Sequence, residues 1–262
     1  MTRATYDTAE DRPADAVLDG RRVLVTGGTR GVGRAVVLTM ARAGAHVLTC
    51  YRQPGPAVDS LRAELGATSG DHRLVRADVR HDEDVRDLID ECRARLGGLD
   101  VVVNNVGAFA PKPYPELSRA EWDATVDGNL TSAHLVTQAA LPLLSAGSSV
   151  INVGSTVTSI GMSGGAHYTA AKAALVGFTR SLARELGPAG IRVNVISPGR
   201  IDTEAMDDLP PEVAARQRAL FASFSALGRL GGTAEVARVA LFLASPAAGY
   251  VTGQNIHVDG CV

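Results

Sequence analysis

The chain has 262 residues, of which 45% are hydrophobic and 21% charged, enough to fill the core of one large domain or two small ones. A formal net charge of −2, a pI near 6.3 and an aromatic content of 4% argue against a nucleic-acid partner. No apolar run approaches the ~20 residues that a membrane span needs, so no membrane partner is expected.

Residues 1–20 mix Arg, Asp, Glu and Thr without a charged-then-apolar leader, which predicts a disordered or loosely docked tail. The three cysteines, Cys50, Cys92 and Cys261, lie far apart and show no metal-ligand spacing. We expect them to be small apolar fillers in a reducing compartment. A cytoplasmic protein without a metal site follows from these observations.

From Arg22 onward, short β-branched runs alternate with longer helical patterns, which predicts an α/β fold with a mostly parallel seven-stranded sheet covered on both faces. The expected strands are Arg22–Thr26, His46–Cys50, Arg73–Ala77, Leu99–Asn104, Ser149–Val153, Arg192–Ile196 and Asn255–Val258. Helices are expected at about Glu83–Leu96, from Ser118, where Ser118 and Glu121 have capping-box spacing, and at about His167–Leu186. No linker divides the chain, so residues 21–262 are predicted to form one domain.

The segment Asp202–Gly228 fits this alternation poorly, with a break at Pro210-Pro211 and a loose helical pattern. An insertion at the carboxyl end of a strand is where a substrate lid would lie, and an ordinary surface excursion is the alternative.

A glycine-rich segment follows the first strand and opens the first helix: Gly27, Gly28, Thr29, Arg30, Gly31, Val32 and Gly33. Glycine lets the backbone turn sharply and approach a pyrophosphate, and the helix N-terminus beyond it offers free N–H groups. Glycines also serve plain strand-to-helix turns, but the position in the first crossover favours a dinucleotide.

The second strand ends in Thr49-Cys50-Tyr51-Arg52, without the acidic residue that usually holds the ribose hydroxyl of NAD. Arg30 and Arg52 would instead suit a 2′-phosphate, so NADP(H) is expected over NAD(H). The alternative is that Arg52 is only a solvated loop charge.

Tyr168 and Lys172 are four residues apart on a predicted helix and therefore share one face, and Ser155 follows the strand Ser149–Val153. A nearby ammonium would lower the pKa of the phenol from ~10 and favour acid/base chemistry. Singly, each residue has a structural explanation: a half-buried packing tyrosine, a solvated lysine, a serine helix cap. Together, downstream of a phosphate loop, they predict a catalytic site.

The segments Thr26–Gly33, Asn104–Gly107, Ser155, Tyr168–Lys172 and Pro198-Gly199 resemble the ordered motifs of the short-chain dehydrogenase/reductase family. The resemblance covers about Arg21 to the last residue and implies a Rossmann-type doubly wound fold. It implies that Tyr168 exchanges a proton with the carbonyl or alcohol oxygen and that Ser155 hydrogen-bonds the same oxygen. Lys172 would hold the nicotinamide ribose, and Asn129 would support a water relay.

The resemblance also implies a set of cofactor contacts. Asp78 and Val79 would lie beside the adenine, and Asn105 and Gly107 would form the wall behind the cofactor. After Pro198 and Gly199, Ile201 and Thr203 would contact the nicotinamide carboxamide. Two departures from the family pattern are Val106, where alanine is usual, and Cys261-Val262, where a second glycine is common.

Three residues separate Tyr168 from Lys172, which resembles the carbonyl-reducing and alcohol-oxidising branch of the family, whereas its enoyl reductase branch has a longer gap. Within the first branch, the sequence is similar to 3-ketoacyl thioester reductases and ketoreductases of secondary metabolism. An NADPH-dependent ketone reductase is therefore predicted. An oxidatively working alcohol dehydrogenase and a non-catalytic dinucleotide-binding regulator are the alternatives. The family's usual helix contacts, here about Ser118–Ser145 and His167–Leu186, imply a homotetramer.

The substrate pocket is expected to be lined by Phe109, the loop Thr156–Gly165 and the segment Asp202–Gly228. The small residues Gly161, Ser163, Gly164 and Gly165 suggest room for a bulky carbonyl substrate, carrier-bound or polycyclic.

Overall fold

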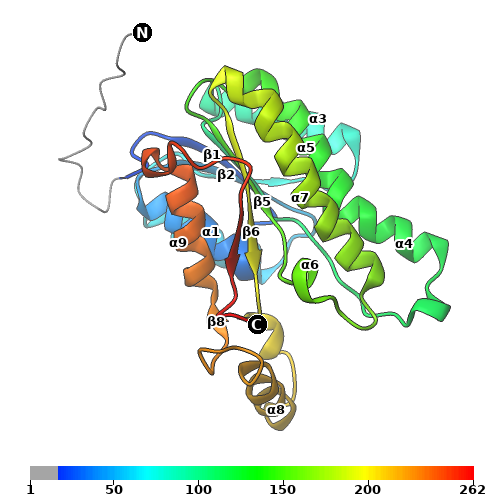
Figure 1. Cartoon of the computed structure of the whole chain (residues 1–262). Coiled ribbons are helices and arrows are strands. Elements are labelled where there is room, and N and C mark those ends of the chain that lie inside the picture. Colours follow the sequence, from blue (N-terminus) through cyan, green and yellow to red (C-terminus); the bar gives the residue numbers. More distant parts are fainter. Residues whose placement is uncertain (1–16) are drawn as a thin grey trace.

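One parallel sheet of seven strands forms the centre of the molecule, with strand order β3-β2-β1-β4-β5-β6-β9 (Figure 1). The structure is a computed structural model that describes residues 17–262. The strands are β1 Arg22–Thr26, β2 His46–Tyr51, β3 Arg73–Arg76, β4 Val101–Asn104, β5 Ser149–Val153, β6 Arg192–Pro198 and β9 Asn255–Val258. The predicted strands are confirmed, with bounds that differ by at most two residues at either end.

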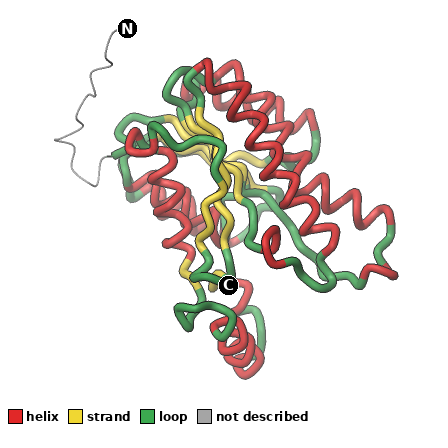
Figure 2. Tube along the Cα trace, viewed as in Figure 1, coloured by secondary structure: helices red, strands yellow, loops and turns green. Residues whose placement is uncertain are grey.

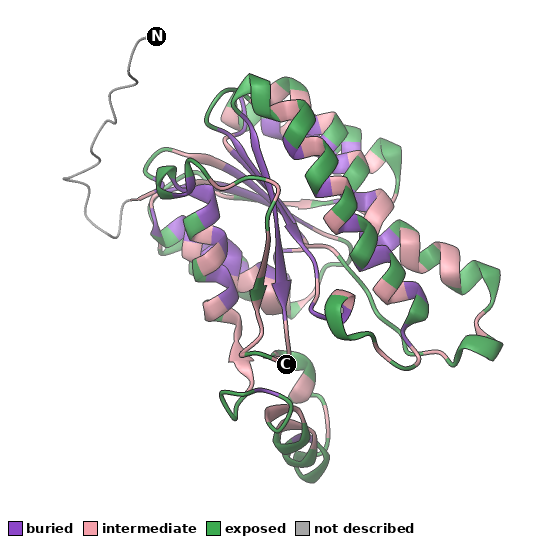
Figure 3. Ribbon diagram, viewed as in Figure 1, coloured by how far each residue is buried: buried purple, intermediate pink, exposed green. Residues whose placement is uncertain are grey.

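Helices cover both faces of the sheet (Figure 2). On one face lie α1 Gly31–Arg42, α2 Pro56–Gly66 and α9 Thr233–Ala244; on the other lie α3 Asp82–Leu96, α4 Arg119–Val126, α5 Ser132–Ala140 and α7 Ala166–Leu186. Side chains alternate along each strand, so Val23 and Val25 join the first hydrophobic cluster and Leu24 the second. The central strands β1, β2, β4, β5 and β6 are therefore buried on both sides, as Figure 3 shows, which explains their apolar runs, whereas the edge strands β3 and β9 are only partly buried.

The path from Arg119 to Ala140 is interrupted by a π-helical turn, Asp127–Thr131, between α4 and α5. The start of α4 is capped as predicted: Glu121 N donates to Ser118 Oγ at 3.2 Å, and Ser118 N donates to Glu121 Oε2 at 2.8 Å. π-Helical turns insert an extra residue into a helix and often mark functional sites. Here the turn carries the buried Asn129.

The segment Asp202–Gly228 projects from the end of the sheet (Figure 1). Its base is tied by a two-stranded pairing of β7 Ile201–Asp202 with β8 Gly231–Gly232. Within it lie a 3₁₀ turn, Glu204–Met206, and the helix α8 Pro211–Ala222, which begins at a proline. The remaining short elements are α6 Val157–Ile160 and 3₁₀ turns at Tyr114–Glu116, Leu141–Leu143, Gly187–Ala189 and Pro246–Ala248.

Two expectations about the chain's periphery need correction. Residues 1–16 lie outside the described residues, but residues 17–20 pack on the domain: Leu18 is fully buried, and its N–H donates to the Ala43 carbonyl at 2.9 Å. Cys50 and Cys92 are buried fillers, and burial raises their thiol pKa values to about 11 and about 12. Cys261, in contrast, is exposed and has a positive φ of 63°, in a turn where its N–H donates to Asp259 Oδ1.

Among residues 17–262, no helix is both long and apolar enough to cross a membrane.

Candidate active site

The carboxyl ends of β1 and β4 lie side by side at the point where the strand order reverses, which is where open α/β sheets bind ligands. Asn105 joins the loops that follow these two strands. Its Nδ2 donates to the carbonyl oxygens of Thr26 at 2.9 Å and Gly27 at 3.1 Å. The bottom of the crevice is therefore fixed by backbone contacts.

The glycines of the first loop have two different roles. A Cβ on Gly28 would lie 2.1 Å from Thr49 Oγ1, and one on Gly33 would lie 2.3 Å from the Gly27 carbonyl oxygen. The backbone is packed so closely at both positions that no side chain fits. Gly31 has a positive φ of 53° and meets only the Thr203 methyl group, at 3.7 Å. Its N–H, at the start of α1, faces a cavity that can receive an anion.

Most of the predicted cofactor residues line two adjoining cavities at this edge. One, of about 380 Å³, is bordered by Gly27, Arg30, Gly31, Val32, Gly33, Asn105, Val106, Gly107 and Thr203. The other, of about 420 Å³, is bordered by Thr29, Arg52, Asp78, Val79 and Gly128 among others. Val106 borders both, so the departure from alanine does put extra methyl groups against this wall.

Three predicted contacts lie in supporting positions. Gly28 N donates to Thr49 Oγ1 at 3.1 Å beneath the loop. The carbonyl oxygen of Pro198 accepts the Thr156 N–H at 3.0 Å, which joins the ends of β6 and β5. Ile201 packs against the hydrophobic cluster beside α1 and α9, whereas Thr203 reaches the cavity.

Arg30 and Arg52 border a smaller recess beside Tyr51 and Gln53, next to the cavity of Asp78. Both are exposed, and neither makes an ion pair with any residue of the described range 17–262. The Asp78 carboxylate is engaged by Arg80, whose Nε lies 2.9 Å away, and this contact lowers the pKa of Asp78. The recess is therefore positive in character, which suits a phosphate better than a ribose hydroxyl.

Glu204 was not foreseen from the sequence. Its Oε2 accepts a hydrogen bond from Gly31 N at 3.0 Å, so a carboxylate of the projecting segment sits at the N-terminus of α1. No cap signal in the sequence indicates this contact, because the two residues are 173 positions apart. It joins the projecting segment to the phosphate loop.

Lys172 and Asn129 converge beside Gly107. Lys172 is buried, and its Nζ donates to the Val153 carbonyl oxygen at 2.8 Å. A Cβ on Gly107 would lie 2.7 Å from Asn129 Oδ1 and 3.0 Å from Lys172 Nζ, so only glycine leaves room for both. Asn129 Nδ2 donates to the carbonyl oxygens of Ala108 and Thr125, at 2.8 and 2.9 Å, while Oδ1 is buried without a hydrogen-bond partner. This buried acceptor is therefore available for a hydrogen bond from a water or a bound molecule.

Burial sets the pKa values of the two titrating groups. It lowers the pKa of Lys172 to about 8 and raises that of Tyr168 above its ordinary value, an effect that interaction with the Ser155 side chain partly opposes. The expectation that Lys172 acidifies Tyr168 is therefore wrong for this structure. Lys172 Nζ lies 5.7 Å from the centre of the tyrosine ring, and loss of water around the phenol is the main cause of its raised pKa.

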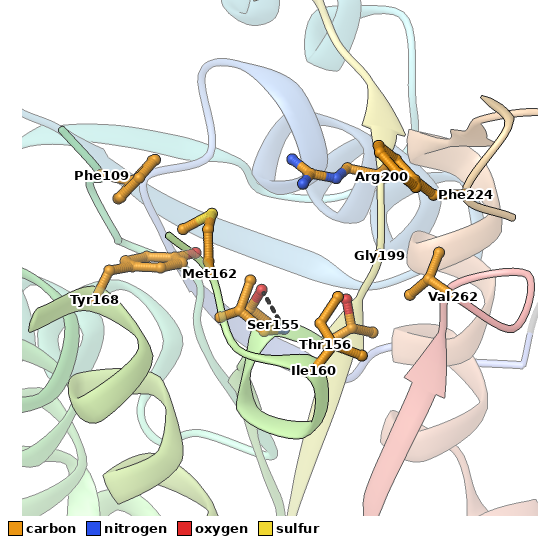
Figure 4. A pocket seen from close by; sticks show the side chains of 11 residues that line it. Phe109, Ser155, Thr156, Ile160, Met162, Tyr168, Gly199, Arg200, Phe224 and Val262 are labelled. Atoms are coloured by element: carbon orange, nitrogen blue, oxygen red, sulfur yellow. Dashed lines mark hydrogen bonds between the residues drawn. The ribbon is translucent and has the colours of Figure 1, made fainter. Parts of the chain in front are cut away.

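Tyr168 and Ser155 border one cavity of about 470 Å³ (Figure 4). Phe109 lies over the Tyr168 ring, with ring centres 5.0 Å apart. The helix-cap explanation for Ser155 has weak support, because Val157 N reaches its Oγ only at 3.4 Å. The hydroxyl is therefore not held as a helix cap, and it interacts with the Tyr168 side chain at the wall of the cavity.

The predicted substrate pocket is confirmed in part. Phe109, Thr156, Val157, Ile160, Met162 and, from the projecting segment, Phe224 line this cavity. The small residues Gly161, Ser163, Gly164 and Gly165 are not among its lining, so the room they suggested is not there. Sequence reasoning missed Arg200 and Val262, which a linear pattern could not place against Tyr168.

Comparisons with known proteins agree with this architecture. A family model described as Enoyl-(Acyl carrier protein) reductase matches residues 27–262. The chain is 37% identical over 246 residues to a 3-oxoacyl-[acyl-carrier-protein] reductase of Synechocystis sp., covering 93% of this chain and 97% of the relative. It is 35% identical to 3-oxoacyl-[acyl-carrier-protein] reductase FabG of Escherichia coli, covering 92% and 97%.

Solved structures lead to the same family. A short-chain dehydrogenase from Burkholderia cenocepacia in complex with NADP superposes with a TM-score of 0.86 at 33% identity, covering 93% of this chain and 98% of that one. A short-chain dehydrogenase/reductase from Serratia marcescens also gives 0.86, at 32% identity, covering 93% and 98%. With its fold, its phosphate loop and its Tyr168–Lys172 pair in place, the chain belongs to the short-chain dehydrogenase/reductase family.

Proposed function

We propose that the protein is an NADP(H)-dependent reductase that converts a ketone to a secondary alcohol. One observation carries this proposal: Tyr168 and Ser155 border the substrate cavity, while Lys172 and Asn129 meet beside Gly107 on the wall of the dinucleotide cavity. Gly107 follows β4 and Ser155 follows β5, its neighbour in the sheet, so we assign the cofactor site and the proton donor to one reaction. The relatives named as 3-oxoacyl reductases support a ketone as the reacting group.

The residues fit a dinucleotide with a 2′-phosphate. The glycine loop borders the cavity without side chains in the way, although the Gly31 N–H donates to Glu204 until a nucleotide displaces it. Gly107 leaves space beside Lys172, and Arg30 and Arg52 border a positive recess. A similar structure was solved with NADP, which supports the same choice here. NADPH, when bound, would supply the hydride.

The protein's own groups would supply the proton and position the ketone. Ser155 would donate a hydrogen bond to the ketone oxygen, and Tyr168 would transfer its phenolic proton to that oxygen as the alcohol forms. Burial raises the pKa of Tyr168 above its ordinary value, so the phenol carries the proton that reduction of a ketone consumes. Asn129 Oδ1 is the free acceptor through which a water could return a proton toward Tyr168 by way of Lys172.

The matching family model carries the description of an enoyl reductase, and the curated relatives carry that of a ketone reductase. The Tyr168–Lys172 spacing of three intervening residues is the ground on which we propose a ketone.

The position of Phe224 in the cavity wall supports the proposal that Asp202–Gly228 acts as a lid. A homotetramer and a cytoplasmic location remain predictions.

The proposal is tested by the absorbance of NADPH in the presence of ketones and, separately, of enoyl thioesters. We expect NADPH consumption with ketones and none with enoyl thioesters. Tight NADPH binding without consumption in either case would favour a non-catalytic regulator. Light scattering tests the assembly: a tetramer is expected, and a monomer would contradict it.

A further inference from the structure

Polar side chains occupy four positions in the wall of the substrate cavity: Ser155, Thr156, Tyr168 and Arg200. Most of the lining is apolar, namely Phe109, Val157, Ile160, Met162, Phe224 and Val262, and the hydroxyls of Ser155 and Tyr168 are accounted for by the proposed reaction. The remaining charged side chain of this lining is Arg200. A cation at the wall of an apolar cavity fixes which ligands can enter it.

Arg200 is held in place from two sides. It follows Gly199 at the end of β6, and its carbonyl oxygen accepts the Gly231 N–H at 2.9 Å. Its guanidinium stacks on the ring of Phe221 in α8, 4.5 Å from the ring centre. Stacking uses the face of the guanidinium and leaves its N–H groups, which lie in the plane, free to donate. Figure 4 shows the side chain extending over the cavity from the chain just after Gly199.

Neighbouring arginines are paired, whereas Arg200 is not. Arg218 binds Asp202 at 3.1 Å and Asp207 at 2.7 Å, and Arg229 binds Glu235 at 2.8 Å. Within the described residues 17–262, no carboxylate lies within 4.0 Å of the Arg200 guanidinium, and no protein acceptor receives a hydrogen bond from it. The residue is only partly exposed, so part of its hydration is lost without a protein partner.

We propose that Arg200 is a specificity-determining residue that binds a carboxylate carried by the ketone substrate. The planar fork of a guanidinium matches the two oxygens of a carboxylate, and an apolar wall strengthens that pairing. The inference rests on the proposed ketone reduction and names its substrate class: an oxo acid whose carbonyl reaches Tyr168 and Ser155 while its carboxylate reaches Arg200. A thioester or ester of the same acid lacks the charge that Arg200 would pair.

The experiment uses a series of oxo acids with increasing separation between ketone and carboxylate, together with the methyl ester of each. The quantity measured is the ratio of kcat/KM for the acid to kcat/KM for its ester. We expect this ratio to exceed one for the acid whose length matches. In Arg200→Met it should fall by about tenfold to a hundredfold, as for loss of a hydrogen bond to a charged group. Arg200→Glu should lower the ratio further by repelling the acid.

Arg216→Met is the matched control, because Arg216 is exposed on α8 and does not border the cavity. It removes the same charge from α8, the helix whose Phe221 stacks on Arg200, and should leave the ratio unchanged. A ratio that is equal in the wild type and in Arg200→Met, or an ester preference in the wild type, would overturn the role of Arg200. If neither acids nor esters consume NADPH, it is the proposed function that fails.

Discussion

The two walls of the active site are built in different ways. The nucleotide side, around Gly27–Gly33 and Asn105, is held by backbone contacts so close that a Cβ cannot be added at Gly28 or Gly33. The projecting segment Asp202–Gly228 has exposed ion pairs within it, such as Arg218 with Asp202, is joined to the C-terminal residues by hydrogen bonds such as Ser225 Oγ to the Gly260 carbonyl oxygen at 3.1 Å, and leaves Leu220, Phe224 and Leu227 exposed. A rigid wall can preorganise the cofactor, whereas a loosely held wall can open for a substrate.

Alanine substitutions at two glycines, Gly33 in the nucleotide wall and Gly228 in the projecting segment, test this difference in rigidity and have the largest expected effect. In Gly33→Ala, the new Cβ would meet the Gly27 carbonyl oxygen at 2.3 Å and Asn105 Nδ2 at 2.4 Å, so the loop must shift. We expect a loss of roughly 1–3 kcal/mol in the free energy of unfolding and loss of NADPH binding. In Gly228→Ala, the new Cβ would have no atom within 4 Å, so the free energy of unfolding should fall only by the strain of the positive φ, about 1–2 kcal/mol. Thermal unfolding and NADPH titration measure both, and intact NADPH binding by Gly33→Ala would show that the nucleotide wall is not rigid.

The second test concerns the choice of cofactor on the rigid wall. Arg52→Asp replaces a cation beside the recess by an anion that would repel a 2′-phosphate. We expect the preference for NADPH over NADH to fall by about tenfold to a hundredfold, measured as the ratio of the two kcat/KM values. Arg62→Asp, an exposed change on α2, is the control. An unchanged ratio would show that Arg52 is only a surface charge.

A third prediction uses the buried Lys172. Burial lowers its pKa to about 8, so the ammonium loses its proton as the pH rises through about 8. Since the neutral amine attracts the nucleotide less, kcat/KM for NADPH should fall about tenfold per pH unit above that value. Deprotonation of Tyr168 does not account for a fall in kcat/KM that begins near pH 8, because burial raises the pKa of Tyr168. A flat profile up to pH 10 would contradict the role of Lys172.

The smallest expected effect lies where the two walls touch. Glu204 places a carboxylate on the Gly31 N–H, where a pyrophosphate would also bind, so the nucleotide must displace it. Glu204→Gln removes the repulsion between the two anions and should tighten NADPH binding by a few-fold, in line with ~0.3–1 kcal/mol for a charge at a helix N-terminus. Glu212→Gln, on the exposed side of α8, should have no effect. Weaker binding by Glu204→Gln would show that the contact supports the site instead.

The comparison also explains what the sequence could predict. The strands, the phosphate loop and the Tyr168–Lys172 face were predictable because buried strands and close glycine contacts leave few alternatives. The contact of Glu204 with Gly31 and the place of Arg200 depend on chain paths through the projecting segment, which no local pattern encodes. The raised pKa of Tyr168 was missed for a similar reason: desolvation depends on Phe109 and the other surroundings, and sequence spacing shows only the nearby charge.

The central claim is that Tyr168 gives its proton to a ketone held above a dinucleotide, and Tyr168→Phe tests it most directly. The variant should bind NADPH with nearly wild-type affinity by fluorescence titration, while its rate of ketone reduction falls by at least about a hundredfold. Reduction at a wild-type rate would contradict the account, because the phenolic hydroxyl would then have no part in the reaction.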